Sequence, residues 1–180
     1  QLVALRTSDG AASWEQALTS GEGRTELERL SGIDGELSVD GDVVYAAAYR
    51  GQVQALSVEN GRQVWSRSLS SYTNVGVSAS QVYAVDADSA VWALDRTSGS
   101  SMWKQDALEH RWLSGPAVQG NYVVVGDLEG YVHWLSISDG KEAARERLSK
   151  NPIQATPVVM GDLVFVEDIA GKVGAYRAAL

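Results

Sequence analysis

A repeat of about 40 residues runs through the whole sequence and constrains the fold more than any other feature. Its apolar anchor recurs at spacings of 51, 38, 41 and 41 residues, at Leu5, Leu56, Leu94, Leu135 and Tyr176. Five residues after the first four anchors stand the glycines Gly10, Gly61, Gly99 and Gly140. Nine residues after them stand Trp14, Trp65, Trp103 and the exception Ala144. Such columns in register indicate stacked copies of one supersecondary unit.

Each copy has the pattern of four short strands separated by tight turns. Between residues 36 and 69, segments rich in Val, Ala and Tyr alternate with turns that end in Gly41, Gly51 and Gly61. Asp-Gly and Asn-Gly pairs supply the positive φ that tight hairpins need, and no helical periodicity of useful length is present. Four strands per 40 residues is typical of a propeller blade. We therefore predict an all-β chain, a β-propeller fragment of about four four-stranded antiparallel blades, half of an eight-bladed ring.

The repeat also predicts where the blades begin and end. We expect complete blades near residues 36–70, 76–108 and 115–149, with split blades at 1–18 and 156–180. Because unpaired edge strands need covering, we expect either a longer propeller or two such halves paired into one ring. The chain begins at Gln1 rather than Met, which fits a processed product or a piece of a longer protein.

Two columns of the repeat have both a mechanical and a functional interpretation. The tryptophans can pack against the neighbouring blade, or they can stack on a ligand. Asp86, Asp127 and Asp168 occupy one column, eight residues before their anchors. Each can cap its own turn through an Asx hydrogen bond. Alternatively, the three carboxylates can face one another across a channel as an all-oxygen calcium site.

The first spacing exceeds the others by about ten residues, and the surplus lies in residues 19–35, TSGEGRTELERLSGIDG. Propellers keep their strands constant and carry function in their loops. Arginine and apolar anchors are common at interface centres, so we expect an enlarged interaction loop here. The alternative is that its leucines only pack over the propeller face. The predicted partner-binding residues are Glu26, Leu27, Arg29, Leu30, Ile33 and Asp34.

A second interruption covers residues 106–115, where His110, Arg111 and Trp112 are adjacent. A histidine beside a tryptophan can mark a site, although a lone loop histidine more often has a solvent partner. The other histidine, His133, falls inside an expected strand. No G-x-S-x-G elbow marks a nucleophile, and the absence of cysteine excludes disulfides and zinc-thiolate sites. We predict no catalytic residues, no metal site and no cofactor, so the chain is not expected to be an enzyme.

The charge balance narrows the range of partners. Acidic residues number 23 against 15 basic ones, a formal net charge of −8. Nucleic-acid binders usually carry a basic face, so we expect neither nucleic acid nor an anionic membrane surface as a partner.

Longer segments resemble a known family. The pattern A-L-x4-G-x3-W, as in residues 55–65 and 93–103, resembles the tryptophan-docking repeat of quinoprotein-type propellers. Residues 125–136 (VGDLEGYVHWLS), 25–34 (TELERLSGID) and 110–117 (HRWLSGPA) resemble the BamB lipoproteins of outer-membrane assembly. The resemblance covers essentially the whole chain and corresponds to the C-terminal half of such a protein.

This resemblance implies a non-enzymatic scaffold at the periplasmic face of the outer membrane in Gram-negative bacteria. Its expected partners are the POTRA domains of BamA, with nascent outer-membrane proteins as further candidates. The implied membrane attachment is an N-terminal lipidated cysteine, which this sequence does not contain. Asp34 matches an acidic binding position of the family, whereas Gly32 stands where another acidic residue is common.

Two other functions remain open at this stage. A quinoprotein-type dehydrogenase fragment would hold pyrroloquinoline quinone and calcium, but the chain lacks the adjacent cysteines of many such enzymes. A generic ligand-binding or glycan-binding propeller would use Trp92, Trp112 or Trp134.

Overall fold

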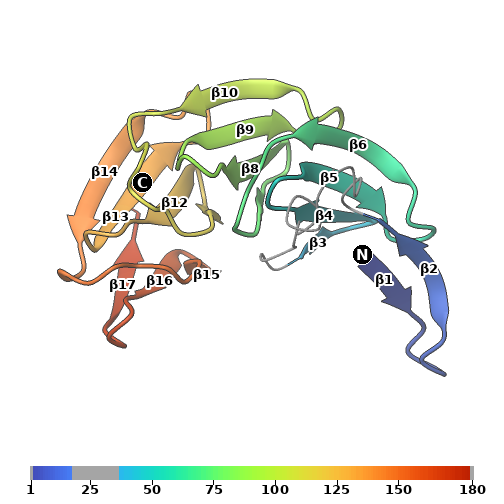
Figure 1. Ribbon diagram of the computed structural model, residues 1–180. Helices are drawn as coiled ribbons and strands as arrows, with labels where there is room; N and C mark the ends of the chain where they lie inside the picture. Colours follow the sequence, from blue (N-terminus) through green and yellow to red (C-terminus); the bar gives the residue numbers. More distant parts are fainter. Residues whose placement is uncertain (1, 18–36, 179–180) are drawn as a thin grey trace, which may run out of the picture.

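The computed structural model describes residues 2–17 and 37–178. These residues form seventeen β-strands in five antiparallel sheets and contain no helix, so none of them forms a helix that could cross a membrane. The sheets follow one another in chain order along an arc (Figure 1). The prediction of an all-β, propeller-type fold is confirmed.

The strands pair with their sequence neighbours in every sheet. The first sheet pairs β1 (Leu2–Leu5) with β2 (Ala12–Gln16). The second contains β3 (Ser38–Asp40), β4 (Val43–Ala47), β5 (Gln52–Ser57) and β6 (Gln63–Ser68). The third contains β7 (Gly76–Val77), β8 (Gln81–Val85), β9 (Val91–Asp95) and β10 (Ser101–Gln105). The fourth contains β11 (Ala117–Gln119), β12 (Tyr122–Gly126), β13 (Tyr131–Ser136) and β14 (Glu142–Arg147). The fifth contains β15 (Val158–Met160), β16 (Leu163–Glu167) and β17 (Val173–Arg177).

The first strand of each blade is its innermost. The short strands β3, β7, β11 and β15 contact one another in sequence, while β6, β10 and β14 follow the outer side of the arc (Figure 1). In the fourth blade this outer strand has every residue exposed. Each blade thus runs from a shared inner layer to a solvated rim.

The core lies between neighbouring sheets rather than inside any one of them. In β8, Val82 and Ala84 pack on the second sheet, whereas Tyr83 and Val85 pack on the fourth. All four side chains are buried because alternate residues point to opposite faces, and both faces are covered. This explains why the middle strands are continuous apolar runs instead of alternating patterns.

A tryptophan on the outer strand of one blade binds the third–fourth turn of the next. The indole N–H of Trp65 donates to the carbonyl of Arg96 at 2.8 Å, and the ring lies against Gly99. A Cβ added to Gly99 would come within 2.5 Å of that ring. Trp14 and Trp103 repeat the arrangement with Val58 and Ile137, at 2.7 and 2.9 Å. The mechanical interpretation of the tryptophan column is confirmed.

The last junction uses different residues because Ala144 replaces the docking tryptophan. Trp134, on the third strand, donates its indole N–H to Gln119 at 2.8 Å. The Gln119 amide then donates to the carbonyls of Asp162 and Tyr176 in the next sheet, at 2.8 and 3.1 Å. The Trp134 and Tyr176 rings meet edge-on with centroids 5.5 Å apart. A side-chain bridge therefore replaces direct docking at this junction.

Large apolar side chains are exposed at both ends of the arc. Val3 and Leu5 on β1 are 42% and 62% exposed, and Val158, Met160 and Val173 on the last sheet are 60% to 71% exposed. In the middle blades, equivalent faces are covered by a neighbouring sheet. The outward faces of the first and last sheets thus have the composition of blade interfaces.

We expect Gly99→Ala to destabilise the fold more than Gly120→Ala. Both glycines have positive φ, 69° and 58°, but a Cβ on Gly120 meets no atom within 4 Å. Gly120→Ala should cost about 1 kcal/mol in backbone strain alone. Gly99→Ala should cost about 2–4 kcal/mol, because it also pushes Trp65 from its turn. Urea denaturation followed by circular dichroism measures both free energies of unfolding, and equal losses would contradict the docking role.

Candidate functional site

Two kinds of loop meet on one face of the arc. The first kind is the hairpin between the second and third strands of a blade, such as residues 86–90. The second is the connection from one blade's outer strand to the next blade's inner strand, such as residues 106–116. Loops that present a face on a rigid sheet scaffold are the usual place for a propeller's binding site.

Each described connection is hydrogen-bonded to the hairpins on both sides of it. In the connection at 106–116, the His110 N–H donates to the carbonyl of Asp88 at 2.8 Å, and the Arg111 carbonyl accepts from Leu128 at 3.0 Å. In the next connection, the Ile153 N–H donates to Asp127 at 2.9 Å and the Pro152 carbonyl accepts from Ile169 at 3.0 Å.

The connection at residues 69–75 repeats this pattern. The Ser71 N–H donates to the carbonyl of Ala48 at 3.4 Å, and the Ser70 carbonyl accepts from Ala87 at 2.9 Å. Three consecutive connections are therefore held in equivalent positions, and together with the hairpins they form one continuous platform.

The aspartate column caps the platform hairpins of the third, fourth and fifth sheets. Asp86 Oδ1 accepts the backbone N–H groups of Asp88 and Ala90, at 3.0 and 2.8 Å. Asp127 and Asp168 accept the two equivalent N–H groups of their own turns, at 2.8 to 3.0 Å. The turn-capping interpretation is confirmed. The second carboxylate oxygens bind separate partners, and among residues 2–17 and 37–178 no cluster of acidic, His or Cys side chains could hold a metal ion.

The fourth blade adds a buried charged network behind its hairpin. Asp127 Oδ2 accepts from Arg111 Nε at 2.7 Å and lies 2.9 Å from His133 Nε2, while His133 Nδ1 lies 2.8 Å from Glu142. His133 and Asp127 are both fully buried. Burial raises the pKa of Asp127, but hydrogen bonds from His133, the Tyr131 N–H and Arg111 outweigh it and hold the pKa at about 2.

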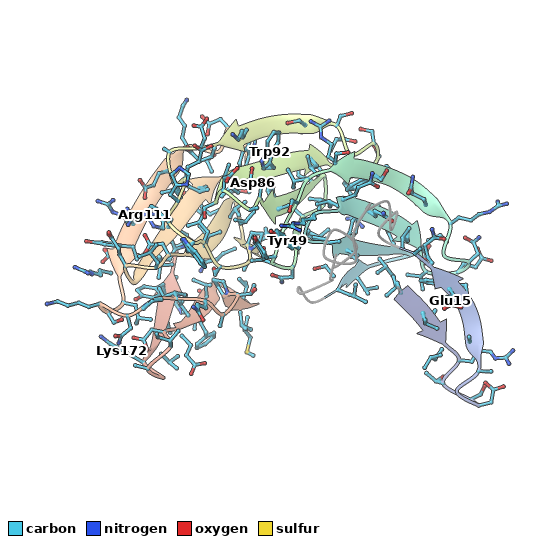
Figure 2. All side chains as sticks on the ribbon, viewed as in Figure 1. Glu15, Tyr49, Asp86, Trp92, Arg111 and Lys172 are labelled. Carbon is cyan, nitrogen blue, oxygen red and sulfur yellow. The ribbon has the colours of Figure 1, made fainter. Side chains whose placement is uncertain are left out.

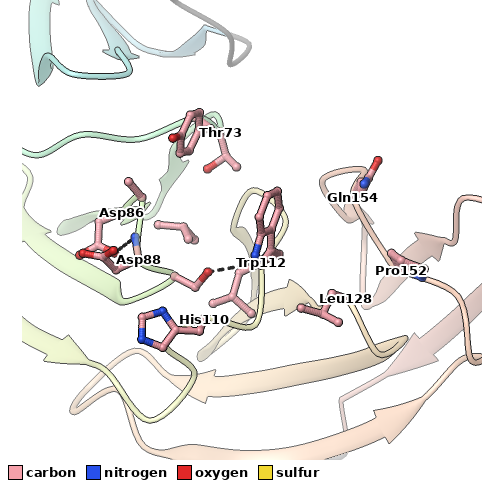
Figure 3. Close-up of a pocket in the computed structure, with 13 residues that line it drawn as sticks. Thr73, Asp86, Asp88, His110, Trp112, Leu128, Pro152 and Gln154 are labelled. Carbon is pink, nitrogen blue, oxygen red and sulfur yellow. Dashed lines mark hydrogen bonds between the residues drawn. The ribbon is translucent and has the colours of Figure 1, made fainter.

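A hollow of about 630 Å³ opens on the platform between the third and fourth blades (Figure 3). Asp86 and Asp88 lie on one side of Trp112, whereas Leu128 and Gln154 lie on the other. We name this hollow the platform pocket. Its volume is within the range of roughly 300–1,000 Å³ that is usual for pockets that hold ligands.

The connection at residues 106–116 holds Trp112 in the open. On one side of it, Arg111 is anchored by ion pairs to Asp127 and Glu129. On the other side, Leu113 is buried in the core between the third and fourth sheets. Trp112 itself is 76% exposed and has a φ of 50°. The contacts of Arg111 and Leu113 thus fix the backbone on both sides of Trp112, and its indole ring points to solvent.

The structure separates the three tryptophans that were candidates for ligand binding. Trp134 is buried in the last blade junction. Trp92 packs beside the core and donates its indole N–H to Asp86 at 2.8 Å (Figure 2). Of the three, Trp112 alone lines the platform pocket.

The predicted partner-binding residues all lie in the connection between β2 and β3, at residues 18–36. This segment is outside the described residues, so Glu26, Leu27, Arg29, Leu30, Ile33 and Asp34 stay a prediction.

The sequence interpretation missed the platform pocket, although one signal for it was present. Ser89 stands in the repeat column that holds glycine in the other hairpins, at Gly51, Gly130 and Gly171. The structure gives Ser89 a φ of 71°, a left-handed value that suits glycine. A serine in that column therefore marked a hairpin with unusual constraints.

Blades of four antiparallel strands, joined by tryptophans that bind the next blade's turn, define this chain as a tryptophan-docked β-propeller. The family model for "Outer membrane protein assembly factor BamB" matches it at residues 1–105 and 102–179. The chain therefore belongs to the BamB family, and the resemblance inferred from its sequence segments is confirmed.

Curated relatives named outer membrane protein assembly factor BamB match nearly the whole chain. The protein of Xanthomonas campestris pv. campestris is 44% identical, over 99% of this chain and 44% of its own length. That of Pseudomonas aeruginosa is 42% identical, over 98% of this chain and 46% of its own. That of Escherichia coli is 34% identical, over 96% and 44%. The chain thus spans about half the length of these relatives.

Solved structures support the same fold. The crystal structure of BamB from Moraxella catarrhalis matches with a TM-score of 0.89 and 29% identity, over 98% of this chain and 52% of that one. A quinohemoprotein alcohol dehydrogenase from Comamonas testosteroni matches with a TM-score of 0.60 at 15% identity, over 81% and 35%. The second likeness shows a shared fold and nothing about activity.

We expect Asp127→Asn to lower the free energy of unfolding by roughly 3–5 kcal/mol at pH 7, because a neutral amide leaves Arg111 and His133 facing an N–H₂ group. The lowered pKa of Asp127 stabilises the fold above about pH 4, and this stabilisation is lost as pH falls through about 2. The deficit of the variant should therefore shrink below pH 4.

Urea denaturation of wild type and variant between pH 2.5 and 7 measures this dependence. Asp162→Asn is the matched control, since Asp162 and its partner Arg177 are both 65% exposed; its effect should stay within about 0.5 kcal/mol. A deficit for Asp127→Asn that does not change with pH would contradict the assigned role.

Proposed function

We propose that the chain is a non-enzymatic, protein-binding scaffold of outer-membrane protein assembly, placed at the periplasmic face of the outer membrane. The observation that carries this proposal is the platform, in which three connections are each hydrogen-bonded to the hairpins on both sides. A rigid surface of this kind orders few groups on binding, which lowers the entropic cost of association. The names of the relatives support the assembly role.

The proposed partner is the POTRA region of BamA. By its place in the repeat, the enlarged segment between β2 and β3 is the counterpart of the three connections that form the platform. Its arginine and acidic side chains would orient the partner, and its leucines and isoleucine would supply buried area. Asp34 is the proposed central acidic contact, and Gly32 removes a second one that is common in the family.

We also propose that the arc is part of a complete ring. The chain spans about half of its relatives, and the outward faces of its first and last sheets carry exposed apolar side chains suited to blade interfaces. The remaining blades of a longer protein, or a second copy of this half, would cover those faces. A lipid anchor upstream of Gln1 would hold the assembly at the membrane.

We expect Arg29→Glu/Asp34→Arg to weaken binding of the full-length protein to the BamA POTRA region at least tenfold, because both proposed charge contacts become repulsive. Isothermal titration calorimetry measures the affinity. The control Glu59→Arg/Arg62→Glu also exchanges an acidic residue and an arginine without altering net charge, but at two exposed positions in the third–fourth turn of the second blade.

The control should bind like the wild type. Wild-type protein that does not bind the POTRA region at about 0.1 mM would overturn the partner, and equal affinity of the two double variants would overturn the site.

A further inference from the structure

We infer that the platform pocket binds a short extended peptide segment in which an aromatic or aliphatic side chain stands next to a lysine or arginine. This peptide site is additional to the partner surface proposed at residues 26–34 and does not depend on it. The inference rests on strain, on exposed apolar surface and on charge, which coincide at this one hollow.

Backbone strain is concentrated around the pocket. Among the described residues, four other than glycine have positive φ, and three of them, Ser89, His110 and Trp112, line this hollow. Such conformations are energetically unfavourable for residues other than glycine and cluster at binding and catalytic sites. The surrounding hydrogen bonds hold them in place: His110 donates its N–H to Asp88, and Leu113 donates its N–H to the Ser89 hydroxyl at 3.4 Å.

The strained backbone around the pocket leaves apolar side chains exposed to solvent. Trp112 stands in the middle of the hollow (Figure 3) and is 76% exposed. Tyr72 and Leu128 on the pocket wall are 46% and 38% exposed. The Tyr72 ring is stacked on Tyr49 with centroids 4.1 Å apart, so its orientation is restricted. An apolar side chain inserted between these groups would remove their surface from water together with its own.

The charge of the pocket is negative. Asp86 and Asp88 line it, and no lysine or arginine is among the described residues of its wall. Asp88 is exposed, and no described side chain forms an ion pair with it. Arg111, which lies between the pocket residues His110 and Trp112 in the sequence, directs its guanidinium to Asp127 and Glu129 instead. The ligand that complements this arrangement carries a cation beside its apolar group.

A peptide fits these features better than an isolated amine. Gln154 lies across the hollow from Asp88 (Figure 3) and is exposed, so its amide can both donate to and accept from a peptide group. Trp112 between the two sides also offers its face to an arginine or lysine side chain. The apolar side chain, the cation and the backbone of the proposed peptide thus each have a complementary group in the pocket wall.

The test is fluorescence polarisation of a labelled peptide, Gly-Lys-Phe-Val-Lys-Gly, titrated with the full-length protein. The comparison peptide has glutamate in place of both lysines. We expect saturable binding of the lysine peptide and at least tenfold weaker binding of the glutamate peptide. Absence of binding at about 0.5 mM protein, or equal binding of both peptides, would overturn the inference.

Two variants locate the peptide. Trp112→Ala should weaken binding about tenfold, because the main apolar contact is lost. Asp88→Asn should weaken it about threefold to tenfold and reduce its dependence on salt. The matched controls are Met102→Ala and Glu59→Gln, which change an exposed apolar and an exposed acidic residue away from the pocket. Pocket variants that bind like the controls would overturn the assignment.

Two further measurements separate the other possible occupants. If Trp112→Ala and Asp88→Asn leave the POTRA affinity unchanged, the pocket is a separate site, as inferred; an equal loss of both affinities would assign it to the POTRA surface instead. Peptide binding that arises only after deletion of residues 20–33 would show that this chain's own segment fills the pocket, which would also overturn the inference.

Discussion

The docking of an indole ring on a glycine turn is the contact on which the rest of the structure depends. It joins one blade's outer strand to the next blade's third–fourth turn, as Trp65 does with Gly99 and the Arg96 carbonyl. Sheets held in this way bury both faces of their middle strands. With the blades fixed relative to one another, the hairpins and connections at one end can hydrogen-bond across blade boundaries and form the platform.

Most of the fold could be predicted from the sequence, because a repeat displays the same constraint several times. The tryptophan and aspartate columns were interpreted correctly, since docking and turn capping each require one residue type at one position. The final junction could not be predicted in this way. Where Ala144 breaks the column, Gln119 and Trp134 replace the missing ring. Because this side-chain bridge occurs at one junction only among the described blades, it leaves no repeated pattern in the sequence.

The site was less accessible to sequence reasoning for a related reason. The platform pocket is built from segments that are distant in the chain, and only the packed blades bring Tyr72, Asp88 and Gln154 to one hollow. Trp112 was a candidate, but its exposure depends on Arg111 and Leu113 being anchored on either side. The predicted partner-binding residues lie outside the described residues, so their role stays a prediction made from the sequence.

The serial docking of blades has a consequence for how the protein can change. The core clusters join neighbouring sheets, so most of the free energy of the array is close to a sum of blade and junction terms. The Thr156 hydroxyl also donates to Asn74 at 2.7 Å, between connections that are not adjacent. A substitution that weakens one junction should mainly lower the stability of the two blades that it joins and should have less effect on more distant blades. The loops of different blades can therefore change in sequence almost independently. One scaffold can acquire several different binding surfaces while keeping the same fold.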